Sequence, residues 1–86
     1  ERMQAIRNLE QTFFKTGQTQ IFMETPYRNN QLVEDILRMC APQLRLCIAK
    51  NINAEDEMIK TDTIQNWKNN KPELHKVPCI FLFGMN

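Results

Sequence analysis

The segment 21–28 constrains the fold most, because an apolar strand, predicted over residues 19–23, runs directly into Pro26. Proline has no N–H to donate to a strand ladder and turns the preceding residue away from helical angles, so the strand must end there. The apolar residues of this strand do not alternate with polar ones, which is typical of a strand covered on both faces. We therefore predict a strand-to-helix turn at a sheet edge, where ligands commonly bind. This turn carries three side chains with binding chemistry: Glu24, Tyr27 and Arg28.

Hydrophobic periodicity predicts the remaining elements. The predicted helices are one that Gly17 ends, one over residues 31–41 that Asn29 or Asn30 caps, and one that begins at Asp62 and holds Trp67 in the core. Further strands are predicted over residues 44–49, 58–60 and 77–83. This order predicts an α/β fold in which three helices pack on a mixed sheet of about four strands. With 86 residues, 42% of them apolar, the chain makes a single small domain.

Several classes of site are excluded by composition. The chain has only two glycines, one histidine and no serine, so it holds no glycine-rich phosphate loop, no multi-histidine metal site and no serine triad. The histidine, His75, is expected on the solvated surface. The three cysteines are odd in number, are not closely paired and lie among apolar residues, which favours reduced core thiols over a disulfide or a zinc site.

Charge and hydropathy bear on the partners of the protein and on its compartment. Eleven basic residues balance ten acidic ones, and a net charge of +1 leaves no strong electrostatic footprint for nucleic acid or for a membrane. The sequence contains no apolar run of about 18 residues and no charged-then-apolar leader. We therefore expect a soluble, cytoplasmic protein without a membrane partner.

Glu24 is the carboxylate that the sequence places at a strand end, where it could meet a ligand as a general base. The alternative is a structural role for Glu24 as a helix cap or in a salt bridge to Arg28.

Three segments resemble one known family in the same order along the chain. Residues 21–28 read Ile-Phe-Met-Glu-Thr-Pro-Tyr-Arg, residues 32–36 Leu-Val-Glu-Asp-Ile, and residues 46–52 Leu-Cys-Ile-Ala-Lys-Asn-Ile. They resemble the tetrapyrrole (corrin/porphyrin) methylase superfamily, the class III S-adenosylmethionine (SAM)-dependent methyltransferases. More narrowly, they are similar to the C-terminal half of the bacterial branch that methylates a ribose 2′-hydroxyl of small-subunit ribosomal RNA. Tyr27 replaces the histidine usual in that branch, and Lys50-Asn51 replaces an Arg-Glu pair.

The resemblance implies a two-domain enzyme with SAM bound in the cleft between the domains. Residues 1–86 would form the C-terminal domain, the N-terminal domain would be absent, and this chain alone would be inactive. The residues implied in cofactor binding are Glu24, Thr25, Ala49, Lys50, Asn51, Pro78 and Cys79. Those implied in substrate binding are Tyr27, Arg28 and Lys50, with Glu24 as the candidate catalytic base and no metal.

Three functions stay open after this comparison of residues. The first is methyl transfer to a ribose 2′-hydroxyl of small-subunit ribosomal RNA, with the RNA or the ribosomal subunit as partner. The second is C-methylation of a tetrapyrrole, and the third is a non-catalytic binding module of similar fold. The family also implies a homodimer for the full-length enzyme, and an exposed sheet edge in this shorter chain.

Overall fold

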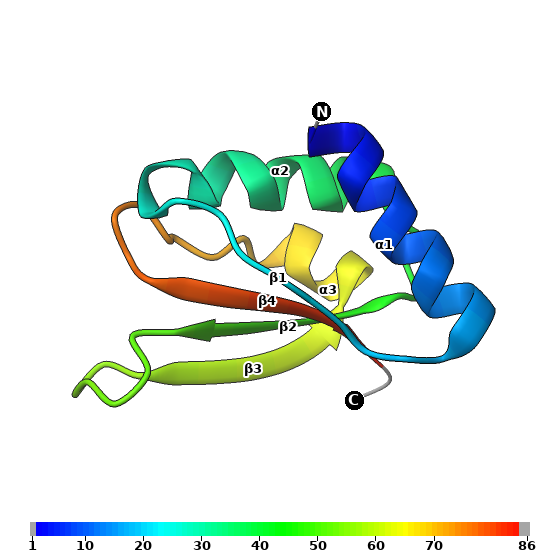
Figure 1. Cartoon of the computed structure of the whole chain (residues 1–86). Helices are drawn as coiled ribbons and strands as arrows, with labels where there is room; N and C mark the ends of the chain where they lie inside the picture. Colours follow the sequence, from blue (N-terminus) through cyan, green and yellow to red (C-terminus); the bar gives the residue numbers. More distant parts are fainter. Residues whose placement is uncertain (1, 85–86) are drawn as a thin grey trace.

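The strand that comes last in the sequence lies inside the sheet. The computed structural model describes residues 2–84 and contains one four-stranded sheet in the order β1-β4-β2-β3 (Figure 1). The elements, in chain order, are α1 (Arg2–Thr16), β1 (Gln20–Phe22), the 3-10 turn η1 (Pro26–Arg28), α2 (Asn29–Met39), β2 (Arg45–Lys50), β3 (Met58–Thr63), α3 (Ile64–Asn69) and β4 (Cys79–Gly84). The predicted α/β class, with about four strands and three helices, is confirmed.

The sheet was expected to be mixed, but every ladder in residues 2–84 is antiparallel. The helix α2 carries the chain over from β1 to β2, and such a crossover ordinarily joins parallel neighbours. Here β4 enters between the two strands and pairs with each of them in the opposite direction. The direction of the ladders therefore follows from a pairing between segments that lie far apart in the sequence.

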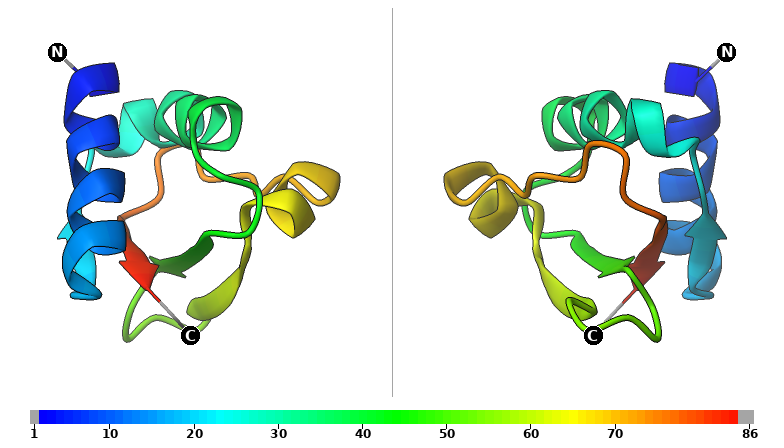
Figure 2. Two further views of the ribbon diagram at one scale, coloured as in Figure 1. Left: turned by 90° about the vertical axis from the view of Figure 1, so that its right-hand side faces the viewer. Right: turned by 90° about the vertical axis from the view of Figure 1, so that its left-hand side faces the viewer.

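All three helices cover the same face of the sheet (Figures 1 and 2). The stripe of α2 that faces the sheet buries Leu32, Val33 and Ile36, and alternate residues of β4 meet it from below with Phe81 and Phe83. These side chains form the centre of the core, because a helix and a sheet must each bury one apolar face against another element.

The strand β1 does not have the cover on both faces that its apolar sequence predicted. Within residues 2–84 it is a sheet edge that pairs only with β4, and no helix or strand of these residues covers the face of the sheet opposite the helices. Phe22 turns inward and packs on the rings of Phe81 and Phe83, whereas Ile21 is 64% exposed. A run of apolar residues thus marked an edge strand beside an open face of the sheet.

The end of α1 and the start of α3 are each set by a capping residue. Gly17 ends α1 in the left-handed conformation, with φ of 74°, as predicted. The strand β3 continues to Thr63, three residues beyond its predicted end, and the N-cap of α3 is Thr63 instead of Asp62 because its Oγ1 accepts the N–H of Asn66 at 3.1 Å. Trp67 is buried, as expected, and donates its Nε1–H to the backbone oxygen of Leu46 at 2.9 Å.

None of the helices in residues 2–84 has the length and apolarity needed to cross a membrane.

Candidate functional site

The ends of β1 and β2 and the start of β4 lie together at one end of the sheet. Because β4 runs against both of its neighbours, its first residues lie beside the last residues of β1 and β2. Lys50 pairs with Cys79, and one residue further the N–H of Asn51 donates to the oxygen of Pro78 at 3.0 Å. The predicted cofactor residues therefore come from three segments that the sheet brings together.

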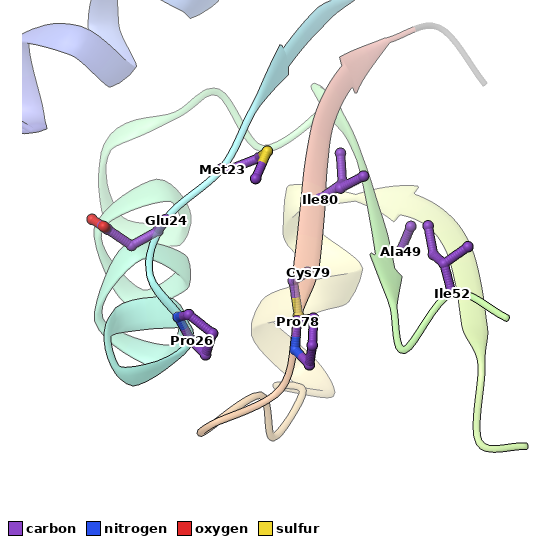
Figure 3. Close-up of a pocket in the computed structure, with 8 residues that line it drawn as sticks. All are labelled: Met23, Glu24, Pro26, Ala49, Ile52, Pro78, Cys79 and Ile80. Carbon is purple, nitrogen blue, oxygen red and sulfur yellow. The ribbon is translucent and has the colours of Figure 1, made fainter. Parts of the chain in front are cut away.

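A cavity of about 320 Å³ opens between these strand ends (Figure 3). Its lining residues are Met23, Glu24, Pro26, Ala49, Ile52, Pro78, Cys79 and Ile80. Glu24 is the one residue among them with a charged side chain, so the walls are mainly apolar. Such a cavity suits a flat, weakly polar group better than a phosphate.

Glu24 stands at the border of this cavity. Figure 3 shows its carboxylate turned away from Ala49 and Ile80. One carboxylate oxygen accepts the N–H of Thr25 at 2.9 Å, and Glu24 also lines a second cavity between α1 and β1. The role of Glu24 as a catalytic base stays a prediction.

The turn from β1 to α2 has the predicted form. Pro26 holds Thr25 in an extended conformation, and the oxygen of Thr25 accepts the N–H of Arg28 at 2.9 Å. Tyr27 is 71% exposed and Arg28 is also exposed, so both lie on the surface beyond Pro26 and outside the cavity lining.

Neither asparagine caps α2, which was the role predicted for one of them. The N-cap is Arg28, without a side-chain hydrogen bond, and Asn29 is fully buried. The side-chain amide of Asn29 donates to the backbone oxygens of Leu74 and Val77, and within residues 2–84 its own oxygen has no hydrogen-bond partner. Asn29 therefore fastens the loop before β4 to the start of α2.

Asn30 makes a second set of bonds to the same loop. Its Oδ1 accepts the N–H of Leu74 at 2.9 Å, and its Nδ2 donates to Glu73 at 2.8 Å. This bond, followed by one from the N–H of His75, lowers the pKa of the Glu73 carboxyl. The bonds from these two asparagines to the loop, which we call the loop clamp, were not predicted, although two adjacent amides at the start of a core-facing helix were a visible signal.

The end of β2 is held by a tight loop. Asn51 adopts the left-handed conformation with φ of 52°, its oxygen accepts the N–H of Ala54 at 2.9 Å, and its side chain donates to Asp56 at 2.9 Å. Across the ladder, burial raises the pKa of the Cys79 thiol, and the charge of Lys50 partly offsets this rise. The Cys79 sulfur is thus kept as a neutral wall of the cavity.

The structure separates the predicted site residues into two groups. Those that line the cavity are Glu24, Ala49, Pro78 and Cys79. Thr25, Lys50 and Asn51 lie next to them along the chain, and their part in cofactor binding stays a prediction. Among residues 2–84 no group of histidine, cysteine or carboxylate side chains could hold a metal ion.

The comparison with known proteins rests on structure. No family model and no curated protein matches the sequence. The methyltransferase CobJ matches over 93% of this chain and 34% of its own, with a TM-score of 0.55 and 14% identity. The uroporphyrin III C-methyltransferase of Thermus thermophilus matches over 77% of this chain and 29% of its own, with a TM-score of 0.50 and 15% identity.

This chain has the fold of part of two methyltransferases. It spans about a third of the length of each, and at such low identity the likeness is one of fold. The methylase-like fold agrees with the superfamily that the residues resemble. Neither neighbour is an RNA methyltransferase by name, so the ribosomal RNA branch gains no support from them.

Proposed function

We propose that this chain supplies one half of the SAM cleft of a methyltransferase that acts on a tetrapyrrole-like macrocycle. The observation that carries the proposal is the apolar cavity at three converging strand ends, in a fold shared with two methyltransferases. Its volume of about 320 Å³ lies at the low end of ligand pockets, which run from roughly 300 to 1,000 Å³. A second domain would complete the enclosure.

The residues of the cavity fit the chemistry of the cofactor. Ala49, Ile52 and Ile80 offer apolar walls for an adenine ring, and the backbone groups at the strand ends offer polar contacts at its rim. The oxygen of Pro78 already accepts one hydrogen bond, from Asn51, and a carbonyl oxygen can accept a second. When bound, SAM would supply an electrophilic methyl group on its sulfonium.

Methyl transfer is an in-line displacement, so the protein mainly aligns two partners and keeps water out. In this chain the apolar lining excludes water, and the bonds that fix the loops at 51–57 and 73–78 keep the walls in place. Glu24 is turned away from Ala49 and Ile80, so we assign it no proton transfer. A base, where the acceptor needs one, would come from outside residues 2–84.

The fold shared with a uroporphyrin III C-methyltransferase favours a conjugated macrocycle as acceptor, and the net charge of +1 offers no strong electrostatic footprint for an RNA strand. Methylation of a ribose 2′-hydroxyl of ribosomal RNA is the second candidate, and the resemblance of residues 21–28 to that branch supports it. In that case Arg28 and Lys50 would contact phosphates. We also propose a homodimer for the full-length enzyme.

The test is a titration of the 86-residue chain with S-adenosylhomocysteine, followed by NMR of the backbone amides. We expect shifts at residues 24–25, 49–52 and 79–80. Ile52→Trp should abolish them by filling the cavity, whereas Phe14→Trp should not. The matched residue Phe14 is also exposed, but it lies on α1 outside the lining. Shifts that fall elsewhere on the chain, or that Ile52→Trp leaves unchanged, would overturn the proposal.

A further inference from the structure

An exposed aromatic residue and two basic side chains gather outside the cavity, next to one of its walls. Tyr27 is 71% exposed, and its ring forms a T-shaped pair with the His75 ring at a centroid distance of 6.3 Å. The ammonium of Lys76 lies 5.9 Å from the centre of the Tyr27 ring. We call Tyr27, His75 and Lys76 the aromatic–basic cluster.

The backbone holds Lys76 in a conformation that lysine rarely adopts. Its φ is 61°, in the left-handed region, where side chains other than glycine and asparagine are disfavoured. The residue is exposed, so burial of its side chain does not repay this strain. A strained residue that the surrounding structure fixes is a recognised feature of ligand-binding sites.

Hydrogen bonds on both sides of Lys76 fix the strained loop. Its own N–H donates to the oxygen of Pro26 at 3.0 Å. The Asn29 amide holds the backbone oxygens of Leu74 and Val77, which come before and after it. The cluster is therefore assembled before any ligand arrives, and binding would cost little ordering of the loop.

The cluster is continuous with the cavity through two prolines. Pro26 and Pro78 both line the cavity, and Tyr27 and Lys76 lie one and two residues from them in sequence. The nearby carboxylate of Glu73 already accepts hydrogen bonds from Asn30 and from the N–H of His75. The Lys76 ammonium faces the exposed ring of Tyr27.

We propose that the aromatic–basic cluster binds a peripheral carboxylate of a planar, conjugated acceptor. The acceptor would stack on the Tyr27 ring, its carboxylate would pair with the Lys76 ammonium, and its apolar body would reach over Pro26 toward the cavity. The inference rests on the proposed function for the identity of the acceptor, but binding at the cluster requires no methyl transfer.

The test uses tetra(4-carboxyphenyl)porphine as the probe and the 86-residue chain, with binding followed by fluorescence and by NMR. Lys76→Gly should weaken binding about fivefold. This variant also relieves the positive φ, so the chain folds at least as well and unfolding cannot explain the loss. Tyr27→Ala should weaken binding to a similar degree, whereas Tyr27→Phe keeps the ring and should bind like the parent chain.

The matched control is Lys68→Gln, which removes one positive charge from α3, outside the cluster and the cavity lining. It should leave binding unchanged, and a porphyrin with cationic N-methylpyridyl groups should not shift the amides of residues 26–28 and 75–77.

Two outcomes would overturn the inference. One is carboxylated-porphyrin binding that Lys76→Gly and Tyr27→Ala leave unchanged. The other is binding of a short oligouridine that these variants weaken, without any binding of the porphyrin, which would assign the cluster to RNA phosphates. Cluster-dependent porphyrin binding, together with S-adenosylhomocysteine shifts that Ile52→Trp leaves unchanged, would sustain this inference and refute the proposed function alone.

Discussion

Replacing Asn29 with alanine should cost the domain about 2 kcal/mol of unfolding free energy. The buried Asn29 side chain loses two hydrogen bonds, to the oxygens of Leu74 and Val77, at about 1 kcal/mol each. The two carbonyl oxygens left without a donor lower the unfolding free energy by about 1 kcal/mol more. Removal of the unpartnered Asn29 Oδ1 raises it again by about 1 kcal/mol. For a domain of this size the loss corresponds to a fall in Tm of roughly 8–16 °C.

The assay is urea and thermal unfolding followed by circular dichroism, with Asn70→Ala as a control. Asn70 is an exposed asparagine at the end of α3, so its loss should change the stability by less than about 0.5 kcal/mol.

Asn29→Asp gives the sharper test of the same bonds. It would place a carboxylate against two carbonyl oxygens, so at neutral pH it should cost about 3–5 kcal/mol. Part of that loss should return as the pH falls, because the protonated carboxyl can donate one bond. An alanine variant within about 0.5 kcal/mol of the parent, or an aspartate variant no less stable than the alanine variant, would refute the reasoning.

Three further perturbations test the fold. Trp67→Phe removes the bond to the Leu46 oxygen, so urea unfolding should show a loss of about 1–2 kcal/mol. Thr63→Ala removes the cap on the Asn66 N–H and should cost about 1 kcal/mol in the same assay, whereas Thr63→Ser should cost little. Burial raises the pKa of Cys40 from 9.0 to about 12, so this thiol should resist alkylation in the folded chain at pH 8, as mass spectrometry can show. Its contribution to stability is fully present below pH 9.0 and should be lost as the pH rises toward 12, which alkaline unfolding measures.

The sequence predicted most elements to within two residues, because their periodicity reflects burial against a single core. The helix α2 and the strands β2 and β4 are the clear cases. Periodicity does not encode which strands pair, so the place of β4 between β1 and β2 could not be read from it. The apolar type of Ile21 likewise could not tell a covered strand from an edge strand with one bare face.

Residues of the candidate site could be predicted only from the resemblance to a known family. The convergence of Glu24, Ala49 and Pro78 followed from matching strand ends to a family, and the structure does bring these residues to one cavity. The loop clamp was missed because Asn29 and Asn30 fit the rule for helix caps, and a local rule cannot see a partner 45 residues away. The resemblance implied Tyr27 in substrate binding, but its contacts with His75 and Lys76 could not be predicted, because these residues lie far from Tyr27 in the sequence.

The inner position of β4 has a consequence for how the chain emerges from the ribosome. The β2–β3 hairpin can pair as soon as residues 45–63 are free, but β1 finds its partner only when residues 79–84 appear. Until then two strands present unpaired backbone groups, a state prone to association with other chains. The four-stranded sheet is therefore complete only after β4 has emerged, and the cavity between the strand ends cannot form earlier.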